Sequence, residues 1–96
     1  MLVRNPALGR ALAQVLGAAP VTLMRGHGAV VVGASLPQAV FRSVYTEVNA
    51  RLQAQAMALS SNVTYLDPEE ARKAEASIVG TIPRPWELWK RKALAK

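Results

Sequence analysis

One histidine stands out among the side chains of this chain that commonly carry metal or proton chemistry. His27 lies between Gly26 and Gly28, a short distance after the apolar run 21–24. An imidazole can bind a metal through either ring nitrogen or move a proton near neutral pH. The flanking glycines leave space beside the ring. A single histidine in a turn is nevertheless more often without a catalytic role, so this signal alone does not define a site.

Two other groups of residues suggest chemistry that a structural role explains better. The acidic segment Asp67–Glu70 could bind a metal, but Asp-Pro-Glu-Glu is also the pattern of a helix N-terminus with a capping box. Trp86 and Trp89 lie beside the basic run 90–92, as in proteins that bind single-stranded nucleic acid. Their spacing of three residues indicates packing on the rest of the chain, with the basic residues in solvent.

Length and composition limit the class of protein further. The 96 residues are 51% hydrophobic and 19% charged, which is typical of one small globular domain. A chain this short buries about two-thirds of its unfolded surface, so an enzyme with a deep cleft would need other chains or a missing segment to complete it. The net charge is +6, and seven of the twelve basic residues lie in 72–96. The absence of cysteine excludes disulfides and thiolate metal sites.

No targeting segment and no membrane span are expected from the hydropathy pattern. Arg4 and Arg10 interrupt what would be the apolar part of a signal peptide. No apolar run approaches the ~20 residues of a membrane-spanning helix. We therefore expect a cytoplasmic protein that does not enter membranes.

Apolar periodicity and capping residues predict the secondary structure. They indicate helices, strands and one irregular segment in the following order: a helix 6–16 ended by Gly17, strands 21–24 and 29–32, a helix from about 35 to 59, a helix from Pro68 to about Ser77, an irregular segment 80–85 and a short helix 86–92. The residues between the strands form either a turn or a bulge in one long strand.

The long helix carries two contrasting faces. Its larger side chains form a stripe that we expect to pack against the sheet, made of Phe41, Val44, Tyr45, Val48, Leu52 and Leu59. The opposite face is small, with Ala39, Ser43, Ala50 and Ala54, and predicts close packing of a second helix or a subunit. Glu47 and Arg51 are spaced for a helical ion pair.

The order of these elements resembles a known family. The run VTLMRGHGAVVVGASLPQAVFRSVYTEVNARLQAQAMAL is similar to the C-terminal half of the class II aldolase and adducin domain. That pattern is an apolar strand, an H-G step, a V-V-V-G strand and a long helix, and HGAVVVG is its most specific part. The preceding helix and the segment LDPEEARK fit the same family. Residues 1–96 would thus form a single partial domain, with 86–96 as a basic tail.

The resemblance implies an α/β fold and a metal site. The fold would be part of an α/β/α sandwich, with a short, mostly antiparallel sheet covered by helices that include the long helix at about 36–59. His27 would be a ligand to a divalent metal, most often zinc, in a homo-oligomer that is a tetramer in the family. The family's H-x-H pair and its catalytic acid belong to the N-terminal half, so no catalytic residue is assigned here. Arg25 would bind an anionic substrate or form a surface ion pair.

One main hypothesis and two alternatives follow. The chain would be part of a metal-dependent lyase that acts on a carbon–carbon bond of a hydroxy-carbonyl or hydroxy-carboxylate substrate through a metal-stabilised enolate, as an aldehyde-lyase or a decarboxylase. The segment RPWELWKRKA is similar to the decarboxylase branch. Because zinc sites need about three protein ligands, we expect the chain to be catalytically incomplete without the missing half. The first alternative is a non-enzymatic module like the adducin head, and the second is a small basic nucleic-acid-binding protein.

Overall fold

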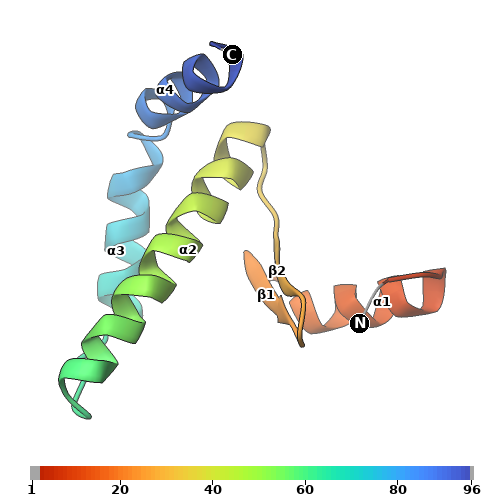
Figure 1. Ribbon diagram of the computed structural model, residues 1–96, viewed down its shortest axis with the longest axis horizontal. Helices are drawn as coiled ribbons and strands as arrows, with labels where there is room; N and C mark the ends of the chain where they lie inside the picture. The colour runs from red at the N-terminus through yellow and green to blue at the C-terminus, as the bar shows by residue number, and fades with distance from the viewer. Residues whose placement is uncertain (1–2, 96) are drawn as a thin grey trace.

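The computed structural model describes residues 3–95, which contain a two-stranded sheet and four helices (Figure 1). The elements are α1 (Pro6–Leu16), β1 (Val21–Met24), β2 (Gly28–Val31), α2 (Leu36–Leu59), α3 (Pro68–Val79) and α4 (Pro83–Leu94). The strands pair antiparallel, with Val21 opposite Val31 and Met24 opposite Gly28. The expected α/β class, with a short antiparallel sheet and a long helix at 36–59, is confirmed.

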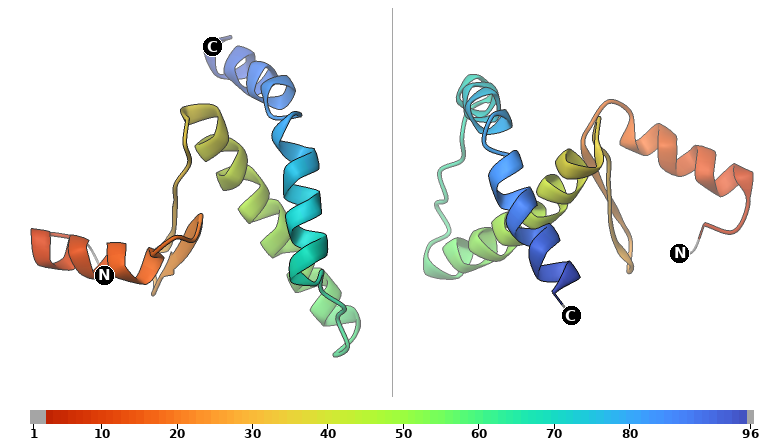
Figure 2. Two further views of the ribbon diagram at one scale, coloured as in Figure 1. Left: turned by 180° about the vertical axis from the view of Figure 1, so that it is seen from behind. Right: turned by 90° about the horizontal axis from the view of Figure 1, so that it is seen from above.

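The long helix α2 separates the other elements into two groups. The hairpin and α1 lie on one side of it, where α1 contacts β1 and β2 contacts α2. On the other side, α3 runs back toward the start of α2 and leads into α4, which packs across the N-terminal part of α2 (Figure 2). Both faces of α2 therefore meet other parts of the chain.

Side-chain capping explains where three of the helices begin. The side chains of Asn5, Ser35 and Asp67 each accept a hydrogen bond from the backbone N–H three residues later, at 2.9, 3.3 and 2.8 Å. Glu70 completes a capping box, because its carboxylate accepts a hydrogen bond from the N–H of Asp67 at 3.2 Å. Each of these helices also has proline in its first turn, where the missing N–H costs little. The prediction of these helix starts is confirmed.

The last helix begins earlier than the sequence suggested. Segment 80–85 was expected to be irregular, but α4 starts at Pro83 and includes Pro85. Proline fits both positions, since N–H groups in the first turn have no acceptor within the helix. The N–H of Trp86 then donates to the carbonyl of Ile82 at 3.2 Å, which closes the first turn. The prediction of an irregular segment was wrong for residues 83–85.

The two faces of α2 are oriented differently from the prediction. Phe41 and Tyr45, expected against the sheet, lie on the side of α4, and the Phe41 ring centroid is 6.3 Å from that of Trp89. Ser43 and Ala50 from the small face lie beside the hairpin instead. Small side chains let the strand backbone come close to the helix, whereas the aromatic rings fill the wider space toward α4.

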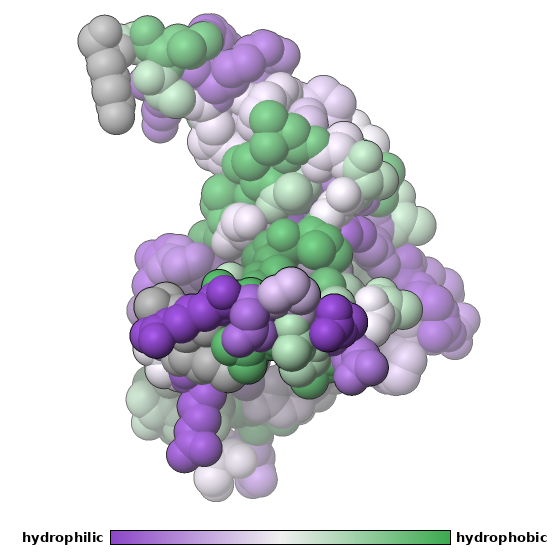
Figure 3. All heavy atoms as spheres, turned by 90° about the vertical axis from the view of Figure 1, so that its right-hand side faces the viewer, coloured by the Kyte–Doolittle hydropathy of each residue, from purple (hydrophilic) through white to green (hydrophobic). Residues whose placement is uncertain are grey.

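The chain leaves much of its apolar surface uncovered. No side chain among residues 3–95 is fully buried. The accessible surface is 7788 Å², against ~5,400 Å² for a typical folded monomer of this mass. The radius of gyration is 15.9 Å, against ~12.5 Å for a compact domain of this length. Figure 3 shows hydrophobic side chains uncovered over the middle of the molecule.

Candidate functional site

His27 lies in a tight turn between the two strands. Its backbone N–H donates a hydrogen bond to the carbonyl of Met24 at 3.0 Å. Gly26 takes a φ of 75° at the third position of this turn, a conformation that type II turns reserve mainly for glycine or asparagine. Residues 25–27 are therefore a hairpin turn and not a bulge in one long strand.

The turn faces a hollow that α2 closes from the other side. This hollow, of about 1000 Å³, lies between the hairpin and the small face of α2. His27 and Arg25 both line it, and both are exposed to solvent. Arg25 forms no ion pair with any carboxylate of residues 3–95. The two residues that the sequence singled out thus both lie at the edge of one open cavity.

Two features of the connection between β2 and α2 determine how close α2 lies to the hairpin. The guanidinium of Arg42 donates from Nη1 to the carbonyl of Val32, directly after β2, at 2.8 Å. A Cβ atom at Gly33 would lie 2.8 Å from the backbone nitrogen of Ala39, so this position has no room for a side chain. The final glycine of the V-V-V-G segment therefore allows the chain to turn tightly from β2 into α2.

Glu47 is the residue of the hollow that the sequence did not assign to it. Its carboxylate accepts hydrogen bonds from Nε and Nη2 of Arg51 at 3.1 and 3.0 Å, so the predicted helical ion pair is confirmed. Glu47 also lines the hollow together with Ser43 and Thr46. Its place on the small face of the helix, beside Ser43, was the one signal that could have associated it with His27.

The described residues do not form a complete metal site. Residues 3–95 contain no group of three or more His, Cys, Asp or Glu side chains placed to hold an ion. In the hollow, His27 and Glu47 are the side chains with an imidazole or a carboxylate. Protein zinc sites usually have three or four such ligands. His27 is exposed to solvent at the edge of the hollow.

The other chemical candidates have structural roles here. The carboxylate of Asp67 caps α3, and the N–H of Glu70 donating to it lowers its pKa below the usual range. Glu69 pairs with Lys73 at 3.7 Å. Trp86 and Trp89 are both half-buried, and Trp89 lies against Phe41 as expected for packing on the body of the chain.

Comparison with known proteins assigns the family. Residues 1–54 match the sequence model of the class II aldolase and adducin N-terminal domain. This chain belongs to the class II aldolase and adducin family. The resemblance carried by HGAVVVG and the following helix is thereby confirmed.

Two curated proteins that are similar to this chain are named as decarboxylases. Decarboxylase tropJ of Talaromyces stipitatus is 35% identical over 109 residues, covering 95% of this chain and 41% of the relative. The 3,4-dihydroxyphthalate decarboxylase of Terrabacter sp. strain DBF63 is 34% identical over 70 residues, covering 73% of this chain and 29% of the relative. The chain thus spans less than half the length of either relative. No solved structure matches it.

Of the helices within residues 3–95, none combines the length and the apolar character that crossing a membrane requires.

Proposed function

We propose that this chain is one part of a metal-dependent lyase, and more specifically of a decarboxylase acting on a hydroxylated carboxylic acid. The observation that carries the proposal is the similarity to two relatives named as decarboxylases, one of them along 95% of the chain. In such a reaction the bond to the carboxylate carbon breaks, its electron pair stays on the substrate carbon, and a proton takes the place of the released CO2. An aldehyde-lyase is the other reaction type that family membership supports.

His27 has the role of one metal ligand in this proposal. Its support is the family motif HGAVVVG, together with the exposed position of His27 at the edge of the hollow. The remaining ligands would come from a polypeptide segment outside this chain, because the described residues offer no complete set. We propose that each protomer of the active protein combines this chain with that segment and that the protomers form a homo-oligomer. A divalent metal, most simply zinc, would bind where the chain and the segment meet.

Arg25 has the role of binding the substrate carboxylate. Its guanidinium is exposed, lines the same hollow as His27, and has no carboxylate partner among residues 3–95. Arginine can bind a carboxylate through two parallel hydrogen bonds, which lysine cannot reproduce. In the active assembly, Arg25→Gln should raise KM at least tenfold while leaving zinc content unchanged, and Arg25→Lys should recover part of the loss.

Zinc titration with and without a complementing segment tests the assignment of His27. We expect the 96-residue chain alone to bind zinc only weakly. Mixed or co-expressed with a family segment that carries an H-x-H pair, it should bind one zinc per complex and release CO2 from hydroxylated aromatic acids. His27→Gln should abolish stoichiometric zinc, whereas Arg10→Gln, on α1 and away from the hollow, should leave it unchanged.

Two outcomes would overturn the proposal. Tight stoichiometric zinc on this chain alone would show that the ligand set is complete without a second segment. Full zinc binding and CO2 release by the His27→Gln complex would show that His27 is not a metal ligand. A complex that forms and binds zinc but has no lyase activity would instead favour a non-enzymatic interaction module.

A further inference from the structure

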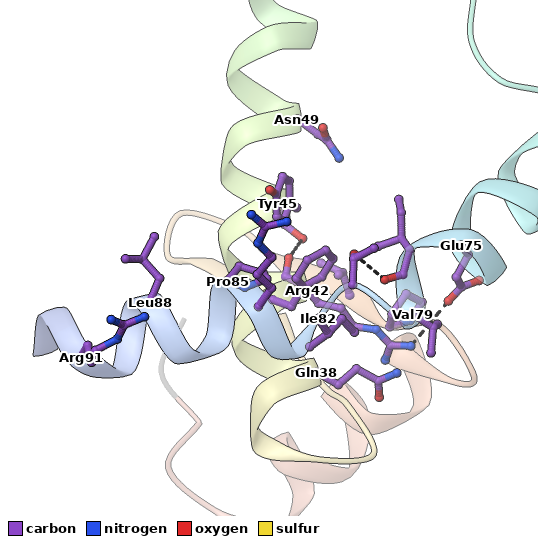
Figure 4. A pocket seen from close by; sticks show the side chains of 17 residues that line it. Gln38, Arg42, Tyr45, Asn49, Glu75, Val79, Ile82, Pro85, Leu88 and Arg91 are labelled. Carbon is purple, nitrogen blue, oxygen red and sulfur yellow. Dashed lines mark hydrogen bonds and ion pairs between the residues drawn. The ribbon is translucent and has the colours of Figure 1, made fainter.

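A second concavity lies on another face of α2. Helices α2, α3 and α4 form most of a groove of about 1050 Å³, which Pro20 and Val21 at the start of the hairpin also line and which we call the three-helix groove (Figure 4). Its apolar walls include Phe41, Tyr45, Val79, Ile82, Pro85 and Leu88. The groove shares only Thr46 with the hollow beside His27. It is therefore a separate surface, and its occupant need not take part in the lyase reaction.

The apolar walls of the groove are poorly covered by the chain itself. Val79 is 51% exposed, Leu88 is 45% exposed and Tyr45 is 41% exposed. They come from three different helices that face one space, as Figure 4 shows. An apolar groove between helices is the usual acceptor for the apolar face of another helix.

The charges around the groove are mostly positive. Three arginines, Arg42, Arg84 and Arg91, line it against a single carboxylate, that of Glu75. Arg42 is already engaged, because its guanidinium lies 3.7 Å from the carboxylate of Glu75 and bonds the carbonyl of Val32. Arg84 and Arg91 pair with no carboxylate in the described part of the chain. The groove thus combines apolar walls with two arginine side chains that have no carboxylate partner in the described part of the chain.

We propose that the three-helix groove binds an amphipathic, acidic helix of a partner polypeptide. Its leucine-like face would cover Tyr45, Val79 and Leu88, and its carboxylates would pair with Arg84 and Arg91. A helix of about 14 residues is ~21 Å long, comparable with α4 beside it. Charge complementarity of this kind selects a partner and accelerates its association.

Other occupants fit these features less well. A second copy of this chain, which carries a net charge of +6, would bring one basic rim against another. A nucleic acid would satisfy the arginines but would leave the apolar walls facing phosphates. The chain exposes roughly 2,400 Å² more surface than a typical folded monomer of its mass. A helix can cover an appreciable part of that excess, whereas a small anion cannot.

Fluorescence anisotropy with two designed peptides tests the proposal on the full chain. One peptide of about 14 residues carries leucine on one face and glutamate on the flanks, and the other has lysine in place of every glutamate. We expect the acidic peptide to bind and to weaken with added salt, and the lysine peptide to bind at least tenfold more weakly. Arg84→Glu combined with Arg91→Glu should reduce the affinity for the acidic peptide at least tenfold.

Matched variants separate the groove from general attraction to a basic chain. Arg10→Glu changes an arginine of α1, outside the groove, and should alter the affinity less than twofold. Leu88→Asp should weaken binding at least tenfold, and Leu88→Met should preserve it, with circular dichroism showing that both variants keep their helices. Equal binding of the two peptides, or equal losses in the Arg10 and Arg84/Arg91 variants, would refute the proposal. So would a dimer in sedimentation equilibrium that Leu88→Asp dissociates, because a second copy would then occupy the groove.

Discussion

Gly33 shows how one residue without a side chain determines the approach of the hairpin to α2. Any Cβ at this position would meet the backbone of Ala39, with its nitrogen at 2.8 Å and its Cα at 3.1 Å. Backbone atoms cannot rotate away as the end of a side chain can, so the contact could be relieved only by moving the start of α2. The distance between the His27 turn and the helix that closes the hollow therefore depends on this glycine.

We expect Gly33→Ala to lower the free energy of unfolding by about 1–3 kcal/mol, as other overpacking substitutions do. Urea denaturation measures the change. Gly80→Ala is the matched control, because nothing lies within 4 Å of a Cβ there and its φ of −71° suits alanine. That control should leave stability unchanged or raise it by about 0.4–1 kcal/mol. Equal effects of the two substitutions would contradict the crowding seen at Gly33.

The residues of the candidate site were predictable only in part. His27 attracted attention because of its type and its glycine neighbours, and Arg25 because it lies beside the histidine that the family resemblance makes a metal ligand. Both line the hollow. Glu47 did not, since its ion pair with Arg51 explains it locally. Whether a residue of a long helix lies beside a turn some twenty positions earlier depends on tertiary packing, which one sequence without an alignment does not specify.

The elements themselves were largely predictable, but their mutual orientation was not. Helix starts follow from local signals, such as the Asp67 cap with its proline and Glu70, and these signals act within one turn. The prediction of which face of α2 packs against the hairpin was wrong. Both faces of α2 are mildly apolar, so amphipathicity did not indicate which face contacts the hairpin and which contacts α4. The early start of α4 was not predicted, and Pro83 and Pro85 are compatible both with an irregular segment and with the first turn of a helix.

The cap of α3 leads to a pH dependence confined to that helix. The hydrogen bond from the N–H of Glu70 lowers the pKa of Asp67 below its usual range. A carboxyl with a depressed folded-state pKa stabilises the fold fully above its unfolded pKa, about 3.9, and loses this contribution as the pH falls through the lower folded value. We expect the start of α3 to fray below about pH 4, as measured by NMR secondary shifts of residues 68–72.

Asp67→Asn provides the control for this titration. Asparagine caps helices about as well as aspartate but does not ionise in this range. The variant should keep α3 at neutral pH, and most of the fraying below about pH 4 should disappear. Unchanged pH dependence in Asp67→Asn would assign the titration to another group.

At the scale of the whole molecule, the absence of a fully buried side chain governs what substitutions can do. Large-to-small changes are costly when they leave a cavity in a packed interior, which residues 3–95 do not have. Phe41 lies near two aromatic rings, with ring centroids 4.6 Å from Tyr45 and 6.3 Å from Trp89, yet it remains only half-buried. The stability of this chain should therefore respond to its partners more than to its own interior.

We expect Phe41→Ala to reduce the free energy of unfolding of the isolated chain by about 1–2 kcal/mol, below the 3–5 kcal/mol typical of a buried phenylalanine. Urea denaturation tests this, with Tyr65→Ala as an aromatic control that is 60% exposed and should change stability by less than about 0.5 kcal/mol. A saturating acidic helix in the three-helix groove should increase the cost of Phe41→Ala, since the ring would then be covered. A cost of 3–5 kcal/mol already in the isolated chain would mean that the helices close over Phe41 without a partner.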